Sequence, residues 1–381
     1  MNKRERYLAA ARRQGVDRIP TLFRSSKVLA RRLMVRHALD PAGGLASAQA
    51  LLAQLGADCW ASGSRIGYYS TFMPKYIGPR PQPPYLEDAA YFFTLGIPAV
   101  TGEVAEYGFD YPAYVAPPLA RAETPSDIPT GYLTRRLAWF DFDCMVNRRA
   151  VSVADTADLL TYENLRHGGE IICIGILNNL YMICCYLRGM EQFLMDLAWN
   201  RPLAERLIAE VGEFCLEFTR RQLTVFGDKA DFYGSWDDVA GQDSMMFAPK
   251  LFRSYYFPLY RQLIAEVKRH NTVYSFHCCG SVHQVLPMMI EAGIDVFDVV
   301  QTSARDMDLE TVYRRYGQDI CMSGAIDVQK LLVGGTPQDV RDEVHRAHDL
   351  WGTRGGLVLG PSHEMAPETP IENVLAIYRD F

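Results

Sequence analysis

Short apolar runs recur along the chain, and each is followed by a polar turn and a longer amphipathic stretch. Near-continuous apolar character is typical of a parallel strand buried on both faces, so each run predicts one such strand. The eight predicted strands are residues 19–23, 57–62, 171–176, 230–235, 272–277, 295–300, 320–324 and 357–360. Helical spacing of apolar residues predicts helices over 201–226, 249–270, 282–292 and 337–351. The last of these begins with Thr336 as N-cap and Pro337 at the first helical position.

Strands that alternate with helices predict a parallel sheet, and eight of them predict closure into a (β/α)8 TIM barrel. The alternative is an open doubly wound sheet, which normally carries a glycine-rich phosphate turn after its first strand. The sequence Phe23-Arg-Ser-Ser-Lys27 at that place is not such a turn. We therefore expect residues 1–381 to form one barrel domain.

Residues 63–170 interrupt this rhythm, because segments 73–87 and 111–130 are rich in Pro and Tyr and show little periodicity. Long loops in a compact domain are usually lids or binding loops. Since this insertion follows the second strand, it is expected to rise from the catalytic face. An arm that contacts a second subunit is the alternative.

Composition and charge argue against a nucleic-acid-binding protein and against a membrane protein. Hydrophobic residues make up 49% and charged residues 22% of 381, the formal net charge is −6, and no dense Lys/Arg cluster indicates nucleic-acid binding. The N-terminus lacks the apolar core of a signal peptide, and no uncharged run approaches the ~18 residues of a membrane span. We expect a cytoplasmic protein whose nine scattered cysteines are reduced and mostly act as small core residues.

The clearest chemical signal is Phe276-His277-Cys278-Cys279-Gly280 at the end of a predicted strand. Side chains alternate along a strand, so His277 and Cys279 share one side and Cys278 faces the other. His363, directly after the eighth strand, would join them at the barrel mouth. Three N/S ligands that leave a fourth position open are the pattern of catalytic zinc. The alternative is that His277 binds substrate and Cys279 only packs.

Two adjacent acids, Asp237 and Asp238, follow another strand and suit general acid/base catalysis. Either could instead cap the following helix, and we expect one functional and one structural residue. Gln301 and Asp327 stand at the same level as weaker candidates for substrate binding. Nucleophile elbows, P-loops and the DxHxxG-type cobalamin signature are absent from the sequence.

Several ordered segments resemble the uroporphyrinogen decarboxylase superfamily. They are Arg4-Glu-Arg-Tyr, Asp17-Arg-Ile-Pro, Leu55-Gly-Ala-Asp, Trp236-Asp-Asp, His277-x-Cys279-Gly280, Glu291-Ala-Gly-Ile-Asp, Gly324-Ala-Ile-Asp-Val-Gln, Gly335-Thr-Pro-Gln-Asp-Val, Pro361-Ser-His and Pro370-Ile-Glu-Asn. True uroporphyrinogen decarboxylases carry Met-Arg-Gln-Ala-Gly-Arg-Tyr near the N-terminus, where this chain has Leu22-Phe-Arg-Ser-Ser-Lys27. One or two cations suit a substrate with eight carboxylates poorly, so the resemblance disfavours that activity.

The other branch comprises zinc methyltransferases that move methyl groups between a corrinoid protein and an acceptor. They use His-x-Cys and a distant Cys after the last strand, and here His363 stands in place of that Cys. Two neutral nitrogens and one thiolate make a more electrophilic metal than one nitrogen and two thiolates. This difference favours an acceptor other than a thiol.

The resemblance thus implies a zinc-dependent methyltransferase or demethylase that works with a separate corrinoid protein and forms a dimer. His277, Cys279 and His363 would hold Zn2+, Asp237 or Asp238 would shuttle a proton, and loop 63–120 would cover a small organic substrate. A decarboxylase or lyase acting on a smaller carboxylic acid, anchored by Arg24, is the first alternative. A non-catalytic barrel that binds a small molecule is the second.

Overall fold

The computed structural model describes residues 1–62, 65–66, 72–79, 99–101, 112–114, 117–146, 162–175 and 178–378. A strand forms in every one of the eight predicted runs. These strands are β1 (Leu22–Phe23), β2 (Cys59–Ser62), β8 (Cys173–Gly175), β9 (Phe232–Trp236), β10 (Val273–His277), β11 (Val296–Val300), β12 (Cys321–Ile326) and β13 (Leu357–Pro361). Five short strands lie in or beside the interrupting region: β3 (Arg65–Ile66), β4 (Lys75–Tyr76), β5 (Ala99–Thr101), β6 (Pro112–Tyr114) and β7 (Phe140–Asp141).

Helices lie before, between and after the parallel strands. They are α1 (Lys3–Ala11), α2 (Lys27–Arg36), α3 (Gly44–Leu55), α5 (Tyr162–His167), α6 (Leu180–Arg188), α7 (Met190–Trp199), α8 (Arg201–Phe226), α9 (Pro249–Leu251), α10 (Phe257–Lys268), α11 (Leu286–Ala292), α12 (Leu309–Tyr316), α13 (Leu331–Gly334), α14 (Pro337–Trp351) and α15 (Ile371–Tyr378). The predicted start of α14 is confirmed, since Thr336 caps it in a capping box with Asp339. Among the described helices, none combines the length and the apolar character needed to cross a membrane.

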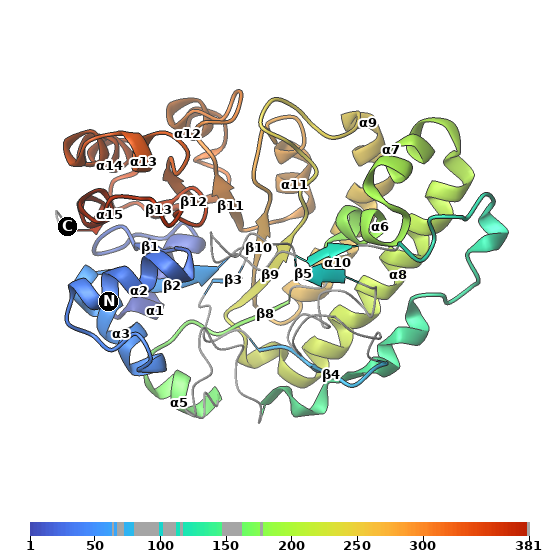
Figure 1. The fold of residues 1–381 in the computed structure, drawn as a ribbon, viewed down its shortest axis with the longest axis horizontal. Coiled ribbons are helices and arrows are strands. Elements are labelled where there is room, and N and C mark those ends of the chain that lie inside the picture. The colour runs from blue at the N-terminus through green and yellow to red at the C-terminus, as the bar shows by residue number, and fades with distance from the viewer. Residues whose placement is uncertain are drawn as a thin grey trace.

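The parallel strands lie side by side in chain order. Strands β8 to β13 form one six-stranded sheet in the order β13-β12-β11-β10-β9-β8, and β1 pairs in parallel with β2. A parallel bridge between Thr21 and Leu359 links β1 to β13. The strands occupy the middle of the molecule with helices around them, and both chain ends lie on the same side (Figure 1). The α/β class is confirmed; the described residues contain no ladder between β2 and β8, and closure of the barrel stays a prediction.

One buried cluster joins α1 to all eight parallel strands. Each strand contributes at least one side chain, and the cluster is Tyr7, Leu8, Ala9, Ala10, Ala11, Val16, Leu22, Cys59, Ala61, Ile171, Cys173, Phe232, Val273, Val296, Cys321 and Val358. These side chains face the interior, and α1 packs against the N-terminal ends of the strands. The presence of Cys59, Cys173 and Cys321 in this buried cluster agrees with the prediction that cysteines serve as small core residues.

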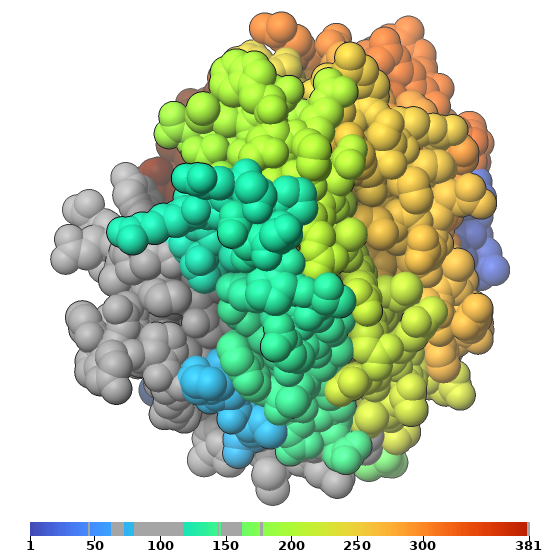
Figure 2. Space-filling model, turned by 90° about the vertical axis from the view of Figure 1, so that its right-hand side faces the viewer, coloured from blue at the N-terminus to red at the C-terminus, as the bar shows by residue number. Residues whose placement is uncertain are grey.

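Residues 117–146 lie against α8 on the outside of the sheet. The carboxylate of Glu210 on α8 accepts hydrogen bonds from the amides of Gly131 (2.9 Å) and Leu133 (3.4 Å). Phe140 packs edge-on against Phe218 of the same helix, with ring centroids 5.2 Å apart. Figure 2 shows this segment as a continuous teal band beside the green helices. This part of the insertion therefore braces an outer helix, whereas most of the predicted lid 63–120 lies outside the described residues.

Candidate metal centre

The site follows from the alternation of side chains on strand β10. Val273 belongs to the interior cluster, so Ser275 and His277, two and four residues further on, point to the same interior side. The neighbouring strand β11 follows the same rule, because Val296 is in the cluster and Asp298 comes two residues later. The interior is therefore apolar at the start of the strands and polar at their C-terminal ends.

Three predicted ligands converge at this end. Ligand atoms of His277, Cys279 and His363 all lie within 4.8 Å of one another. The imidazole rings of His277 and His363 have centroids 5.8 Å apart and meet edge-on. His277 is buried and the other two are partly buried. The predicted convergence of two strand ends is confirmed, and the resulting donor set of two nitrogens and one sulfur suits zinc.

Asp298 is a site residue that the sequence analysis missed. Nδ1 of His277 lies 2.7 Å from Oδ2 of Asp298, which stands directly opposite it in the β10–β11 register. Arg24 donates from Nη2 to both oxygens of this carboxylate, at 2.9 and 3.0 Å. The available signal was an acid in the middle of the apolar run Val296-Phe-Asp-Val-Val300, since buried acids are rare unless paired.

The charges of these groups follow from their surroundings. Burial alone would raise the pKa of Asp298, but Arg24 and the hydrogen bond from His277 outweigh it, and the pKa lies well below its usual range. Burial, with smaller contributions from the neighbouring His277 ring and the Arg24 guanidinium, lowers the pKa of His363 to about 3. Asp298 is therefore anionic and His363 neutral near pH 7. A neutral imidazole is the form that binds a metal ion.

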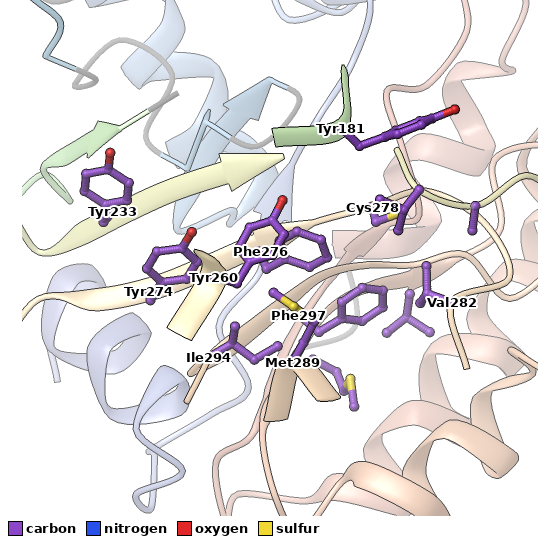
Figure 3. Close-up of a cluster of buried hydrophobic side chains, with 14 of the residues drawn as sticks. Tyr181, Tyr233, Tyr260, Tyr274, Phe276, Cys278, Val282, Met289, Ile294 and Phe297 are labelled. Carbon is purple, nitrogen blue, oxygen red and sulfur yellow. The ribbon is translucent and has the colours of Figure 1, made fainter. Parts of the chain in front are cut away.

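The two adjacent cysteines differ as predicted. Cys278 is fully buried on the opposite side of the chain and joins Phe276 and Phe297 in the apolar layer under the helices (Figure 3). Cys279 is partly exposed, and its amide and Sγ lie 3.3 and 3.5 Å from Oδ1 of Asp238. Burial and the Asp238 carboxylate raise the pKa of the Cys279 thiol, so without a cation beside it this residue stays protonated.

Gly280 allows the loop that carries Cys279 to approach its neighbour closely. Its φ is 140°, and a Cβ at this position would lie 2.6 Å from the carbonyl oxygen of Gly241 and 2.9 Å from that of Ala240. The amide of Ser281 also donates to the carbonyl of Gly241 at 2.8 Å. The close contact of these two loops holds Cys279 near Asp238.

Asp237 lies outside the site, in contrast to the predicted position at the mouth. Its carboxylate accepts hydrogen bonds from the amides of Tyr181 (2.8 Å) and Met182 (2.9 Å) in the first turn of α6 and from the hydroxyl of Tyr260 (2.7 Å). The reason is alternation: Phe232 faces the interior, so the odd-numbered Asp237 faces the helices. The helix it caps is α6, which precedes it in sequence. Burial raises its pKa to about 7 despite these three donors.

The two predicted substrate-binding residues Asp327 and Gln301 form hydrogen bonds with nearby protein groups. The carboxylate of Asp327 accepts from the amides of Gln329, Lys330 and Leu331, at 3.1, 2.8 and 3.1 Å, which caps the turn into α13. Gln301 is buried and donates to the side chain of Gln242 at 3.1 Å.

Arg24 is fully buried and paired with Asp298. Only Nη2 of the guanidinium is engaged by Asp298, and the anchoring of a substrate carboxylate by Arg24 stays a prediction.

Known proteins resemble the chain in both sequence and fold. The family model described as uroporphyrinogen decarboxylase (URO-D) matches residues 142–379. A methylated-thiol–coenzyme M methyltransferase from Methanosarcina mazei is 24% identical over 218 residues, which cover 56% of this chain and 54% of that protein. A uroporphyrinogen decarboxylase from Coxiella burnetii is 22% identical over 237 residues, covering 60% of this chain and 62% of that one.

A solved structure of a methyltransferase from Methanosarcina mazei has the same fold. It matches 99% of this chain and 97% of its own with a TM-score of 0.58 at 18% identity. The sequence matches to curated relatives span only about half to three-fifths of those proteins. The family model, by contrast, matches well over half of the chain and includes β8 to β13 with His277, Cys279 and His363. The chain belongs to the uroporphyrinogen decarboxylase family, as its ordered sequence motifs predict.

Proposed function

We propose that this protein is a zinc-dependent methyltransferase or demethylase that moves a methyl group between a small organic substrate and a separate corrinoid protein. The observation that carries the proposal is the convergence of His277, Cys279 and His363 within 4.8 Å at one end of the strands. Resemblance to the methyltransferase branch and the 24% identity to a methylated-thiol–coenzyme M methyltransferase support it.

The donor set fits zinc. Three protein ligands leave a fourth position of a tetrahedron for a substrate or water, which distinguishes catalytic from structural zinc sites. Nδ1 of His277 lies 2.7 Å from a carboxylate oxygen of Asp298, and metal-binding imidazoles usually make such an outer contact. Zinc bound there would lower the pKa of a thiol, hydroxyl or water that coordinates it, making that group a stronger nucleophile near neutral pH.

The surrounding residues take three tasks in this proposal. Asp298 fixes the ring of His277, and His363 stays neutral because its pKa is about 3. Asp238 is the proton acceptor, because its Oδ1 already lies 3.5 Å from the Cys279 thiol. Asp237 is left out, since its oxygens hold α6 and Tyr260.

The same proposal includes a closed barrel, a loop over the substrate, a docked corrinoid protein and a dimer. The eight parallel strands would close into a barrel, for which the shared interior cluster is the support. Loop 63–120 would cover the substrate, the corrinoid protein would dock over the mouth, and two chains would form a cytoplasmic dimer. His363 in place of a cysteine favours a hydroxyl or amine over a thiol as the methyl acceptor or donor.

The direct test uses a reduced corrinoid protein and candidate methyl donors. Incubation with the enzyme should change the cobalt absorption spectrum, and the same mixture with His277→Ala should show no change. Methoxylated compounds, methylated amines and methyl thiols cover the donor classes. If none of these donors gives a response while a carboxylic acid releases carbon dioxide, the decarboxylase alternative holds instead. The match to a uroporphyrinogen decarboxylase is the reason for including this comparison.

A further inference from the structure

We propose that Arg24 and Asp298 form a buried positioning pair that fixes His277 as the tautomer protonated on Nδ1, so that its Nε2 lone pair faces Cys279 and His363. The role in metal binding rests on the proposed function, whereas the tautomer itself does not. Neither residue is a catalytic residue in this proposal, because both act through His277.

His277 and Asp298 are held side by side by the pairing of strands β10 and β11. They are register partners on neighbouring parallel strands, and Nδ1 lies 2.7 Å from Oδ2. An ionised carboxylate only accepts hydrogen bonds, so Nδ1 must carry the ring proton. Nε2 is then the nitrogen with the free lone pair, and it belongs to the ring that meets His363 edge-on at 5.8 Å. The backbone adds a second tie, because the amide of Cys278 donates to the carbonyl of Asp298 at 2.8 Å.

The carboxylate of Asp298 contacts Arg24 as well as His277. A fully buried carboxylate without a partner is driven to its neutral form. A neutral carboxyl group could donate a hydrogen bond to Nδ1. Nδ1 would then be the acceptor nitrogen, so the ring proton would be on Nε2 and would block metal binding there. Arg24 prevents this outcome, since its Nη2 contacts both carboxylate oxygens and both side chains are 0% exposed.

Stability alone does not account for the burial of Arg24. Its Nε and Nη1 are buried and have no hydrogen-bond partner among the described residues. Unpaired buried donors are unfavourable, and a buried ion pair often contributes no more stability than well-packed apolar side chains. A buried guanidinium with two unpaired donors therefore indicates a functional role. Asp298, which it contacts, is hydrogen-bonded to His277.

The first measurement needs no variant and no metal. Protein labelled with 15N in its histidine rings is freed of metal and studied by NMR at about pH 8, with His277→Gln used to assign the His277 signals. We expect His277 to be protonated on Nδ1. A ring protonated on Nε2, or an equal mixture of tautomers, would overturn the proposal.

The second measurement is zinc affinity by competition with a chelator. Asp298→Asn keeps the side-chain size and removes the charge, and should weaken zinc binding about 10- to 100-fold, the range typical of outer contacts to metal ligands. Asp295→Asn is the matched control, since Asp295 lies just before the same strand and contacts Lys268 and the Tyr274 amide away from the site. It should bind zinc like the wild type.

Two further variants, Arg24→Met and the double variant Arg24→Met/Asp298→Asn, test whether Arg24 affects zinc affinity only through Asp298. If Arg24 acts through Asp298, the double variant should lose no more zinc affinity than Asp298→Asn alone. It also removes both buried charges together, which protects against a loss of folding caused by one orphaned charge. Wild-type affinity in Asp298→Asn would refute the positioning role. A wild-type protein that binds no zinc but shows the Nδ1 tautomer would refute the proposed function and leave the tautomer assignment intact.

Discussion

The carboxylates of Asp237 and Asp238 are adjacent in the chain but belong to different parts of the molecule. Asp237 binds the first turn of α6 and the hydroxyl of Tyr260, whereas Asp238 contacts the amide and thiol of Cys279. One acid thus secures an outer helix and its neighbour borders the candidate metal centre. This difference makes the roles of the two residues separable by experiment.

Stability should depend on pH through Asp237. Its folded-state pKa is raised to about 7 by burial, while an unfolded aspartate titrates at about 3.9. The folded state therefore binds the proton more tightly, so this contribution is complete below about pH 4 and is lost as pH rises to about 7. The free energy of unfolding should fall by up to about 4 kcal/mol from this group over that window.

Urea unfolding of the wild type and Asp237→Asn at several pH values checks this expectation. The variant should be less stable at pH 4 by ~1–3 kcal/mol, because its amide meets a backbone donor. Its stability should nevertheless change less between pH 4 and pH 7. Equal pH slopes in the two proteins would show that Asp237 does not titrate in this range.

Metal content should distinguish the two adjacent cysteines. Protein purified without chelator should carry about one zinc per chain, and Cys279→Ser should lose most of it because a thiolate ligand is removed. Cys278→Ser is the matched control and should keep its zinc, since Cys278 is buried on the opposite side. Elemental analysis of the three proteins is the measurement. Equal metal in wild type and Cys279→Ser would remove Cys279 from the site.

Gly280 should be intolerant of a side chain. Alanine there would place Cβ 2.6 Å from the Gly241 carbonyl oxygen at a φ of 140°, so the loop carrying Cys279 must move. We expect a loss of about 1–3 kcal/mol in the free energy of unfolding and weaker zinc binding. Gly334→Ala is the control, because a Cβ added at Gly334 would have no described atom within 4 Å. Thermal unfolding and chelator competition on both variants test this, and equal effects would contradict it.

His363→Cys should retain the metal and alter the choice of acceptor. The change creates the ligand set of the methyltransferases that this chain resembles, with one imidazole and two thiolates. A second thiolate donates more charge to the metal, so reactivity should shift toward thiols. Zinc content and rates with matched thiol and alcohol acceptors measure the effect. Loss of zinc in this variant would indicate that His363 has a different task.

Much of the fold and the convergence of His277, Cys279 and His363 could be predicted from the sequence. Apolar runs located all eight parallel strands, and alternation correctly separated Cys278 from Cys279. The side on which Asp237 lies depends on where β9 ends and which of its residues face inward, and the run of apolar letters does not define that register. Asp298 escaped notice because its partner Arg24 is 274 residues away, so only the three-dimensional structure reveals the pair.

The cluster between α1 and the strands has a consequence for kinetics. Because α1 fills the end at which the strands begin, a ligand of His277 would, in the proposed function, enter from the polar end. A small methyl donor and a corrinoid protein would then have to share a single entrance. The two should therefore bind in order, with the small methyl donor first. A saturating excess of the corrinoid protein should inhibit turnover, because it would cover the entrance before the small methyl donor has bound.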